Sequence, residues 1–352
     1  MQVIQQLKHI MWAGLSLWLT ACGGIQYMGI ETRNPGEVTF PREVRKVLMV
    51  NNAAPQPEKS GYTYRLMGVV QDTARVQADS ALFDVCTSCG LAILDADYFD
   101  DVLLFHESVR DSSLLFVKDS RLTQPQVIAL CEANGADAVI SLDKMLFSMD
   151  REVTGLGAGF VDGTIKIHMN GILRAYLPTQ EKPLATVLVK DSVEVHQAAE
   201  SLEILDFYLP NANDALRLAG DYLGRQVASY FVPHWSEETR WYFSSSNSRW
   251  KEAAAYASAN RWEQAAQLWS ALYRSNTSEK ARAELASNLA LACEMQNNLP
   301  KAREWAEKAR DLFRQAGGND AKEVRLLQVY ADVLKARIES DQKLNEQIEY
   351  KY

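Results

Sequence analysis

Two neighbouring stretches of regular alternation dominate the middle of this sequence. Apolar and polar side chains alternate through residues 164–178, and residues 184–197 repeat the pattern after the short segment TQEKP. Because successive side chains of a β-strand point to opposite faces, the alternation predicts two strands, each with one buried and one exposed face. Joined by so short a turn, they form a long antiparallel hairpin. Such a hairpin is stable only with further strands or helices on its apolar face.

The sequence around the hairpin supplies those strands and helices. Apolar runs that end at polar residues or glycine predict strands, and apolar positions three to four residues apart predict helices. The expected strands are 45–53, 101–107 and 136–150, and the expected helices are 73–96, 123–134 and 213–230. Thr123 can cap the second helix, which Gly135 stops. The order β-α-β-α-β, hairpin and closing helix predicts a mixed sheet packed by helices in residues 38–248.

This order of elements resembles a small α/β domain of bacterial envelope proteins. Similar domains occur in the curli secretion channel lipoprotein, in the lipoprotein activators of penicillin-binding proteins and at the N-terminus of the Tol-system propeller protein. The stretches KVLMVNNA, NGADAVIS and YFVPHW carry the resemblance. It implies a fold, and it does not transfer an activity.

Residues 250–314 contain two matching helix pairs that are offset by 37 residues. The matching small and large positions are Ala253, Tyr256, Trp262, Ala265, Trp269 and Leu272 in the first pair, and Ala290, Cys293, Leu299, Ala302, Ala306 and Ala309 in the second. The pattern resembles the tetratricopeptide repeat, whose usual period is about 34 residues. A third helix, 320–339, would cap the array, and the residues after it are expected to fray. The predicted fold class is therefore α+β, with an all-α tetratricopeptide-like tail at 249–352; a generic helical bundle is the alternative.

A tetratricopeptide-like array implies a concave surface that holds a peptide or helix of a partner protein. On this interpretation Tyr256, Trp262 and Trp269 are the candidate partner-binding residues. The alternative is that the array packs against the chain's own front domain. The aromatic residues expected to make such an internal contact are Trp235, Trp241, Tyr242 and Trp250.

The N-terminus has the order of features of a lipoprotein signal peptide. Lys8 precedes an apolar run at 10–19, which is too short to span a membrane. The run ends in Leu-Thr-Ala-Cys, which resembles the bacterial lipobox. The resemblance implies a signal peptide at 1–21, lipid attachment at Cys22 and a tether at 22–37. With no Asp and no acidic cluster directly after Cys22, it implies the periplasmic face of the outer membrane. A chance cysteine after a buried helix is the alternative.

Charge separates the two halves of the chain and bears on possible partners. Residues 22–248 carry 19 Lys and Arg against 30 Asp and Glu, whereas residues 249–352 carry 17 against 15. Nucleic-acid binding depends on clustered basic residues, so the acidic front domain argues against that partner. The change in balance also supports a domain boundary near residue 248.

No motif in the sequence assembles a catalytic, cofactor-binding or metal-binding site. Cys86 and Cys89 form a C-x-x-C inside an apolar helical stretch; buried structural thiols are favoured, with a disulfide or a redox or metal role as alternatives. The glycine-rich segment 155–163 precedes a strand and not a helix, which predicts a β-connection. The acidic segment 95–101 lacks the spacing of a calcium loop. His168 and His196 lie on the two hairpin strands, where they are expected to be exposed.

The layout of lipobox, small α/β domain and helical tail resembles that of Bacteroidota lipoproteins. It predicts a non-enzymatic adaptor in the cell envelope, held at the membrane by its lipid and bound to another envelope protein. One alternative is a subunit of an oligomeric secretion or channel assembly of the outer membrane. A second alternative is a small-ligand sensor or an enzyme in the front domain.

Overall fold

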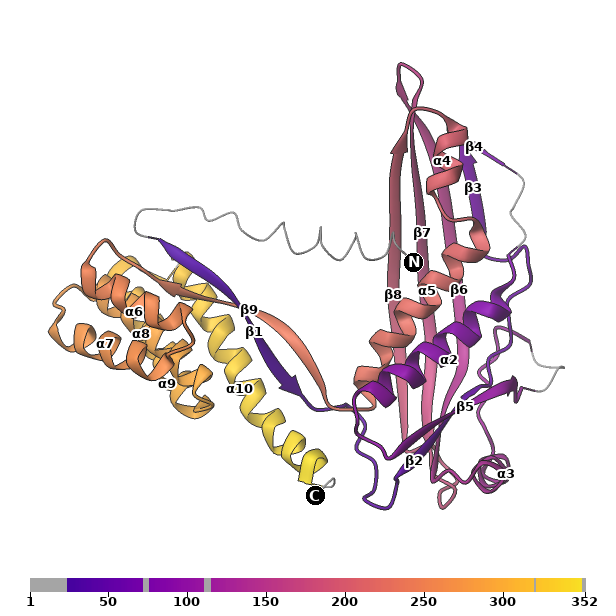
Figure 1. Cartoon of the computed structure of the whole chain (residues 1–352), viewed down its shortest axis with the longest axis horizontal. Helices are drawn as coiled ribbons and strands as arrows, with labels where there is room; N and C mark the ends of the chain where they lie inside the picture. The colour runs from indigo at the N-terminus through magenta and orange to yellow at the C-terminus, as the bar shows by residue number, and fades with distance from the viewer. Residues whose placement is uncertain (1–23, 72–75, 111–114, 320, 350–352) are drawn as a thin grey trace. The chain divides into compact units, whose positions relative to one another are not determined.

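The computed structural model describes residues 24–71, 76–110, 115–319 and 321–349, and it confirms the α+β class (Figure 1). The chain forms two compact units, and each takes residues from both halves of the sequence. Of the described residues, the sheet unit comprises those within 33–234 and 343–349. The helical unit comprises those within 24–32 and 235–342.

The sheet unit is built around one long central strand, β6 (Ala138–Gly157), which begins within the strand expected at 136–150 and continues beyond it. On one side β6 pairs antiparallel with β7 (Phe160–Tyr176), which pairs antiparallel with β8 (Ala185–Ala199). On its other side, the first half of β6 pairs parallel with β2 (Lys46–Asn51), and β2 pairs parallel with β5 (Asp101–Ser108).

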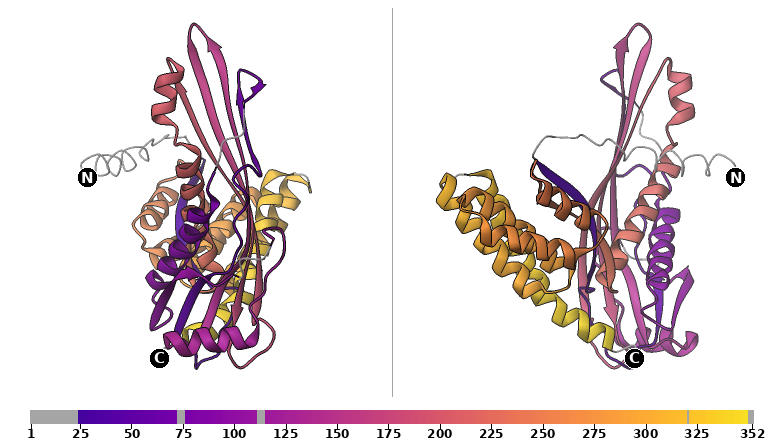
Figure 2. Two further views of the ribbon diagram at one scale, coloured as in Figure 1. Left: turned by 90° about the vertical axis from the view of Figure 1, so that its right-hand side faces the viewer. Right: turned by 60° about the vertical axis from the view of Figure 1, so that its left-hand side comes forward.

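The second half of β6 has a different partner on that same side. There it pairs parallel with β3 (Tyr62–Leu66), which pairs antiparallel with the short β4 (Val69–Val70). The sheet therefore has a base formed with β2 and β5 and an extension formed with β3 and β4. Figure 2 shows the strands of this extension running past the ends of the helices.

Helices cover both faces of the base. Helices α2 (Ala78–Asp95) and α5 (Ala212–Val227) pack on one face, where the alternation of β2 directs Val47 and Met49. Helix α3 (Gln124–Asn134) packs on the other face, which receives Leu48 and Val50. The short α4 (Leu202–Tyr208) lies along the extension, and the 3-10 turn η1 (Ala228–Tyr230) follows α5.

Local signals explain where α3 begins and ends and why α2 and α5 approach each other closely. At the start of α3 the Thr123 side chain accepts a hydrogen bond from the backbone of Gln126, and the Gln126 side chain accepts one from the backbone of Thr123. This reciprocal pair is a capping box. Gly135 ends the helix in a left-handed conformation, with φ of 65°. Helices α2 and α5 approach so closely that a Cβ on Gly224 would lie 2.4 Å from the Val85 carbonyl oxygen. Only glycine fits that crossing without a shift of the backbone.

The helical unit contains the two expected helical hairpins in an antiparallel stack, visible in the right panel of Figure 2. The first hairpin is α6 (Ser248–Ser258) and α7 (Trp262–Ser275), and the second is α8 (Glu279–Met295) and α9 (Leu299–Gly317). A fifth helix, α10 (Lys322–Glu349), follows. Strands β1 (Ile25–Asn34) and β9 (His234–Phe243) form a separate two-stranded ribbon beside these helices.

Among the differences from the sequence-based prediction, two concern the ends of the chain. Residues 25–34, expected within a tether, form β1, because a strand more than 200 residues later supplies their partner. Residues 340–349, expected to fray, continue α10. Within the sheet unit the Gln347 side chain is fully buried and bonds the backbone of Gly36 through both its oxygen (2.9 Å) and its nitrogen (3.0 Å).

Candidate functional site

The surface of the helical unit that was expected to hold a partner is occupied by the chain's own strand β9. The side chain of Asn288, in the middle of α8, is fully buried. Its Oδ1 accepts the N–H of Phe243 at 2.7 Å, and its Nδ2 donates to the Phe243 carbonyl at 2.8 Å. One side-chain amide thus satisfies both backbone groups of a β9 residue, as it would for an added peptide strand.

Aromatic contacts continue this packing along β9. Ring centroids lie 5.4 Å apart for Trp241 and Tyr330, 6.1 Å for Tyr242 and Trp269, and 5.7 Å for Phe243 and Phe313. Trp241, Tyr242 and Trp250, predicted to make an internal contact, all belong to the core of the helical unit or pack against it. Their contacts lie within this unit.

The three candidate partner-binding residues do not form a surface. Trp269 is fully buried and Trp262 is 7% exposed, so neither indole can contact a partner while the unit is folded. Tyr256 is half-buried, with the Arg261 guanidinium 4.6 Å from its ring centroid. The two indoles are instead part of the core of the helical unit, and Trp269 packs against Tyr242 of β9.

A buried charged cluster also holds β9 to the helices. Glu294 of α8, 5% exposed, accepts two bonds from the Nε and one from the Nη2 of Arg240 in β9, at 2.9–3.2 Å. Tyr330 of α10 donates to the same carboxylate at 2.5 Å, and Arg337 pairs with it. Burial, together with the charge of Glu294, raises the pKa of the Tyr330 hydroxyl well above its ordinary value. The ribbon is therefore a fixed part of this unit.

An exposed apolar surface lies instead at the end of the sheet extension. Of the 19 large hydrophobic side chains exposed among the described residues, nine belong to the β3–β4 turn, the β6–β7 turn and α4. Figure 2 shows α4 and the β3–β4 turn on either side of the end of the β6–β7 hairpin. We name this surface the apolar tip, and it comprises Met67, Val69, Val70, Leu156, Phe160, Leu202, Ile204, Phe207 and Tyr208.

Helix α4 presents its largest side chains outward because of how it is attached. The Ser201 side chain caps it by accepting the N–H of Ile204 at 3.3 Å. Its one fully buried residue, Leu205, packs over Gly163 of β7, where an added Cβ would lie 2.8 Å from a Leu205 methyl. With Leu205 facing the sheet, Phe207 faces solvent and is 84% exposed.

Two further contacts fix the tip. Arg151 of β6 forms an ion pair with Asp206 of α4, and its guanidinium lies 5.0 Å from the Tyr64 ring centroid. The β6–β7 turn has positive φ at Gly157, Ala158 and Gly159 (88°, 51° and 89°). The glycine-rich segment 155–163 therefore contains a tight β-connection, and Leu156 and Phe160 flank its three positive-φ residues.

The rim of the apolar tip is acidic. Glu152, Glu200 and Glu203 are exposed, and no ion pair within the described residues neutralises them. The two arginines nearby are already paired, Arg151 with Asp206 and Arg65 with Asp150 at 3.9 Å. The surface thus combines exposed apolar side chains with unpaired negative charge, which is typical of protein-binding sites and unfavourable at an anionic lipid surface.

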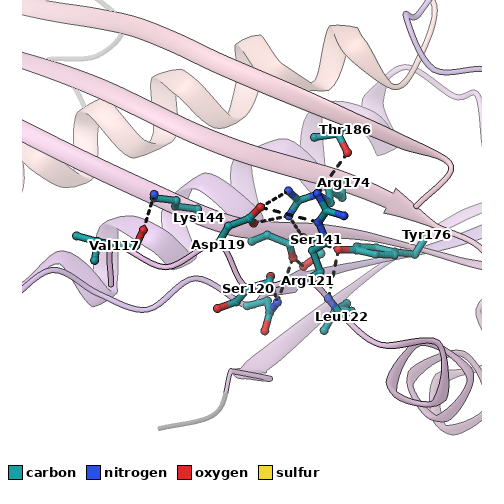
Figure 3. A network of polar contacts seen from close by, with 12 residues as sticks. Val117, Asp119, Ser120, Arg121, Leu122, Ser141, Lys144, Arg174, Tyr176 and Thr186 are labelled. Atoms are coloured by element: carbon teal, nitrogen blue, oxygen red, sulfur yellow. Dashed lines mark hydrogen bonds and ion pairs between the residues drawn. The ribbon is translucent and has the colours of Figure 1, made fainter. Parts of the chain in front are cut away.

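The most extensive buried polar cluster of the sheet unit lies at the base, centred on Arg174 of β7 (Figure 3). Its Nη1 donates to Asp143 of β6 at 2.7 Å, and both Nη atoms donate to Asp119 at 2.7 Å. Asp143 also accepts bonds from Asn52, Ser141 and Tyr176, so its four partners saturate the carboxylate. Tyr176 in turn accepts the Leu122 N–H. The cluster ties the loop before α3 to the sheet.

The protonation behaviour of this cluster fits a structural role. Burial raises the pKa of Asp143, while its four hydrogen bonds oppose the rise. The hydrogen bond from Arg174 lowers the pKa of Asp119. Burial would lower the pKa of Arg174, but bonds to both carboxylates outweigh this and raise it. Each of the three charges has a partner in the cluster, and Arg174 and Asp143 are buried, as in a structural ion-pair network.

A hollow of about 560 Å³ lies beside α3, and its lining includes one thiol and the carboxylates of Glu43, Glu132 and Asp137. Its one thiol, Cys131, has its pKa raised to about 11 by burial, so it is protonated at neutral pH. The Asp137 carboxylate accepts the N–H groups of Arg45 and Lys46, both at 2.8 Å. The Cys131 thiol is thus protonated, and the Asp137 carboxylate is engaged in backbone hydrogen bonds.

The remaining candidates from the sequence are placed as follows. Cys86 and Cys89 are free, buried thiols of α2, and burial raises the pKa of Cys89 to about 12. His168 and His196 are not neighbours, since His168 pairs with Ser192 and His196 with Thr164, and His196 lies 2.6 Å from Asp162. The acidic segment 95–101 joins α2 to β5. Cys22 lies outside the described residues.

No group of three or more His, Cys, Asp or Glu side chains among the described residues is placed to hold a metal ion. None of the helices they form has both the length and the apolar character needed to cross a membrane.

Comparison with known proteins identifies two families. The family model "Domain of unknown function (DUF8603)" matches residues 44–243, and the model "Domain of unknown function (DUF6340)" matches residues 251–336. A search of curated proteins found no match. The first match includes most of the sheet unit together with β9, and it covers more than half of the chain. The chain therefore belongs to the DUF8603 family.

Proposed function

We propose that this protein is a non-enzymatic interaction protein of the bacterial cell envelope, anchored by a lipid on Cys22, whose partner protein docks on the apolar tip. The observation that carries the proposal is the gathering of nine exposed hydrophobic side chains at one end of the sheet unit. Exposed hydrophobic side chains that gather at one place on a surface, and are not scattered singly over it, mark interaction sites. The helical unit supports this choice of site, since its own β9 occupies the surface expected to bind peptides.

The chemistry of the tip defines the kind of partner. Phe207, Tyr208 and Phe160 are aromatic, and aromatic anchors carry a large share of the energy at protein interfaces. The unpaired carboxylates of Glu152, Glu200 and Glu203 favour basic residues around the partner's contact surface. The partner is therefore an apolar surface with a basic rim, on a protein and not on an anionic membrane.

A site-specific cross-linking experiment tests the docking site. A photoreactive amino acid at Phe207 is expected to give a discrete protein adduct in intact cells. The same residue at Val329, which is 62% exposed on α10 of the helical unit, is the matched control. The Phe207 adduct should disappear when Phe160 is replaced by Glu, which places a charge at the centre of the tip. Equal adducts at both positions, or an adduct that survives Phe160→Glu, would refute the proposal.

Charge reversal tests the chemistry of the partner. Glu203→Lys should weaken formation of the Phe207 adduct because it opposes the expected basic rim. Glu181→Lys is the control, since this exposed acidic residue lies in the turn between β7 and β8, away from the tip. Loss of the adduct in both variants would indicate a non-specific effect of net charge.

The lipid anchor has its own test. In Cys22→Ala the acceptor thiol is gone, so the precursor should stay uncut and leave the outer-membrane fraction. Gel mobility and membrane fractionation measure both effects. Normal cleavage and membrane association of that variant would contradict the anchor, whatever the tip binds.

A further inference from the structure

The sheet of the sheet unit ends in a long free edge. Strand β8 is 15 residues long, and within the described residues its only strand partner is β7. On the opposite side the sheet ends in β4, which has two residues, and in β5, which has eight. A long free edge presents a row of unpaired backbone N–H and C=O groups, to which another strand can add.

Side chains on the two faces of β8 differ in character. On the face without α5, Lys190, Ser192, Glu194 and His196 are all exposed. On the other face Val189 is buried, whereas Val193 and Val195 are only half-buried. The half-buried valines indicate an apolar layer that is incomplete at this edge.

We propose that a second copy of this chain adds its own β8 antiparallel to this edge, around a two-fold axis through Ser192. In that register Lys190 of each copy lies opposite Glu194 of the other, on the same face of the joined sheet. Val189 lies opposite Val195 of the other copy, so the apolar layers join. This contact is separate from the apolar tip, and the inference goes beyond the proposed function.

The charges already present in the sheet favour this register. Within one copy Asp150, Lys166 and Glu194 occupy successive strands at the same level, and Lys166 lies 3.8 Å from Glu194. Lys190 of the second copy would extend this row to four strands, along which negatively and positively charged side chains alternate. Opposite charges directly across strands stabilise a sheet, and like charges destabilise it.

Neighbouring registers lack this match. An axis through residue 190 would place Lys opposite Lys, and an axis through 194 would place Glu opposite Glu. Axes through 191 or 193 would place Glu194 opposite Leu188 or Ser192, which leaves the charge unmatched. Ser192 is thus the position about which the edge is complementary to itself, as a two-fold interface requires.

Cysteine cross-linking of the detergent-extracted full chain tests the register. In Ser192→Cys the two introduced thiols lie across the axis, with Cβ atoms about 5 Å apart, so oxidation or a short bis-maleimide should give a covalent dimer. Thr186→Cys is the matched control, because residue 186 is exposed on the same face of β8. Its two copies would lie about 40 Å apart, at 3.3 Å per residue over 12 residues. The unsubstituted chain gives the background from native thiols.

Charge exchange tests the interface in solution. Lys190→Glu and Glu194→Lys should each weaken the dimer by about tenfold in sedimentation velocity, because each creates two like-charged pairs. The double exchange should restore the dimer, while circular dichroism confirms that all variants are folded. A chain that stays monomeric, a dimer indifferent to these exchanges, or equal cross-linking at 186 and 192 would overturn the proposal.

Discussion

Replacing Arg174 by Met should destabilise the sheet unit by about 3–5 kcal/mol, because it leaves a buried carboxylate without its cation. Asp143 is 1% exposed and lies 2.7 Å from Arg174, so no water replaces the lost partner. Methionine approximately conserves the length of the side chain. The expected cost is therefore electrostatic, with a minor contribution from packing.

The effect should shrink as the pH falls. Burial already raises the pKa of Asp143, and removing Arg174 raises it further. A carboxyl whose pKa is higher in the folded state destabilises the fold at neutral pH and ceases to do so once protonated. Asp119 has the opposite pH dependence in the unsubstituted chain. Its pKa is lowered in the folded state, so its charged form stabilises the fold at neutral pH, and this stability is lost at acidic pH. The difference in stability between variant and parent should therefore narrow between pH 7 and about pH 5.

Hydrogen exchange read by mass spectrometry is the appropriate assay, because it resolves the two units. Peptides from residues 138–145 and 170–176 should lose protection in Arg174→Met. Tryptophan fluorescence is an internal control, since every tryptophan of the described residues lies between 235 and 305, in the helical unit. Arg121→Met is the matched substitution, because Arg121 is exposed and 3.9 Å from Asp119. Its cost should stay below about 1 kcal/mol.

The reasoning would be refuted if both methionine variants lost the same protection, or if Arg174→Met were no more stable at pH 5 than at pH 7. Adding Asp143→Asn to Arg174→Met removes the unpaired charge and should recover part of the lost stability. A double variant less stable than the single one would show that packing, and not charge, dominates at this site.

Three further substitutions test the packing of each unit. Asn288→Ala should cost about 2–3 kcal/mol, because two backbone groups of Phe243 lose their bonds; tryptophan fluorescence during urea unfolding measures it. Glu294→Gln should lower the free energy of unfolding by about 3 kcal/mol in the same assay, since Arg240 stays buried without a full counter-charge. A loss below about 1 kcal/mol would contradict the role of Glu294 as that counter-charge. Gly224→Ala should lower the free energy of unfolding by about 1–3 kcal/mol, because the added methyl group forces α2 and α5 apart. Circular dichroism at 222 nm during unfolding measures this change. An unchanged unfolding midpoint would show that the crossing tolerates a methyl group.

Local patterns predicted most of the sheet unit correctly. The alternation of residues 164–178 and 184–197 became β7 and β8, and Thr123 and Gly135 bound α3 as expected. These features depend on neighbouring residues, so the sequence contains them directly. The two helical hairpins were found for the same reason, from spacing within each helix.

Features that depend on distant partners were missed. Strand β1 pairs with β9, and no local pattern reveals a partner some 200 residues away. The polar end of α10 was expected to fray, yet Gln347 is buried because backbone groups of Gly36 and Val38 bond its amide. The apolar tip was missed because α4 was not predicted. Its signals were present: Ser201 can cap a helix, and the segment LEILDFY that follows is rich in large apolar residues.

The pairing of β1 with β9 and the burial of Gln347 have a consequence for how the chain completes its fold. Each unit needs segments from both ends of the sequence, so neither is complete until nearly all of the polypeptide is present. Contacts between residues so far apart in sequence form late and slowly. An N-terminal fragment ending near residue 248 should therefore expose the sites that α10 and the helices normally cover. We therefore expect a fragment limited to either matched segment, 44–243 or 251–336, to lack part of the unit to which it belongs.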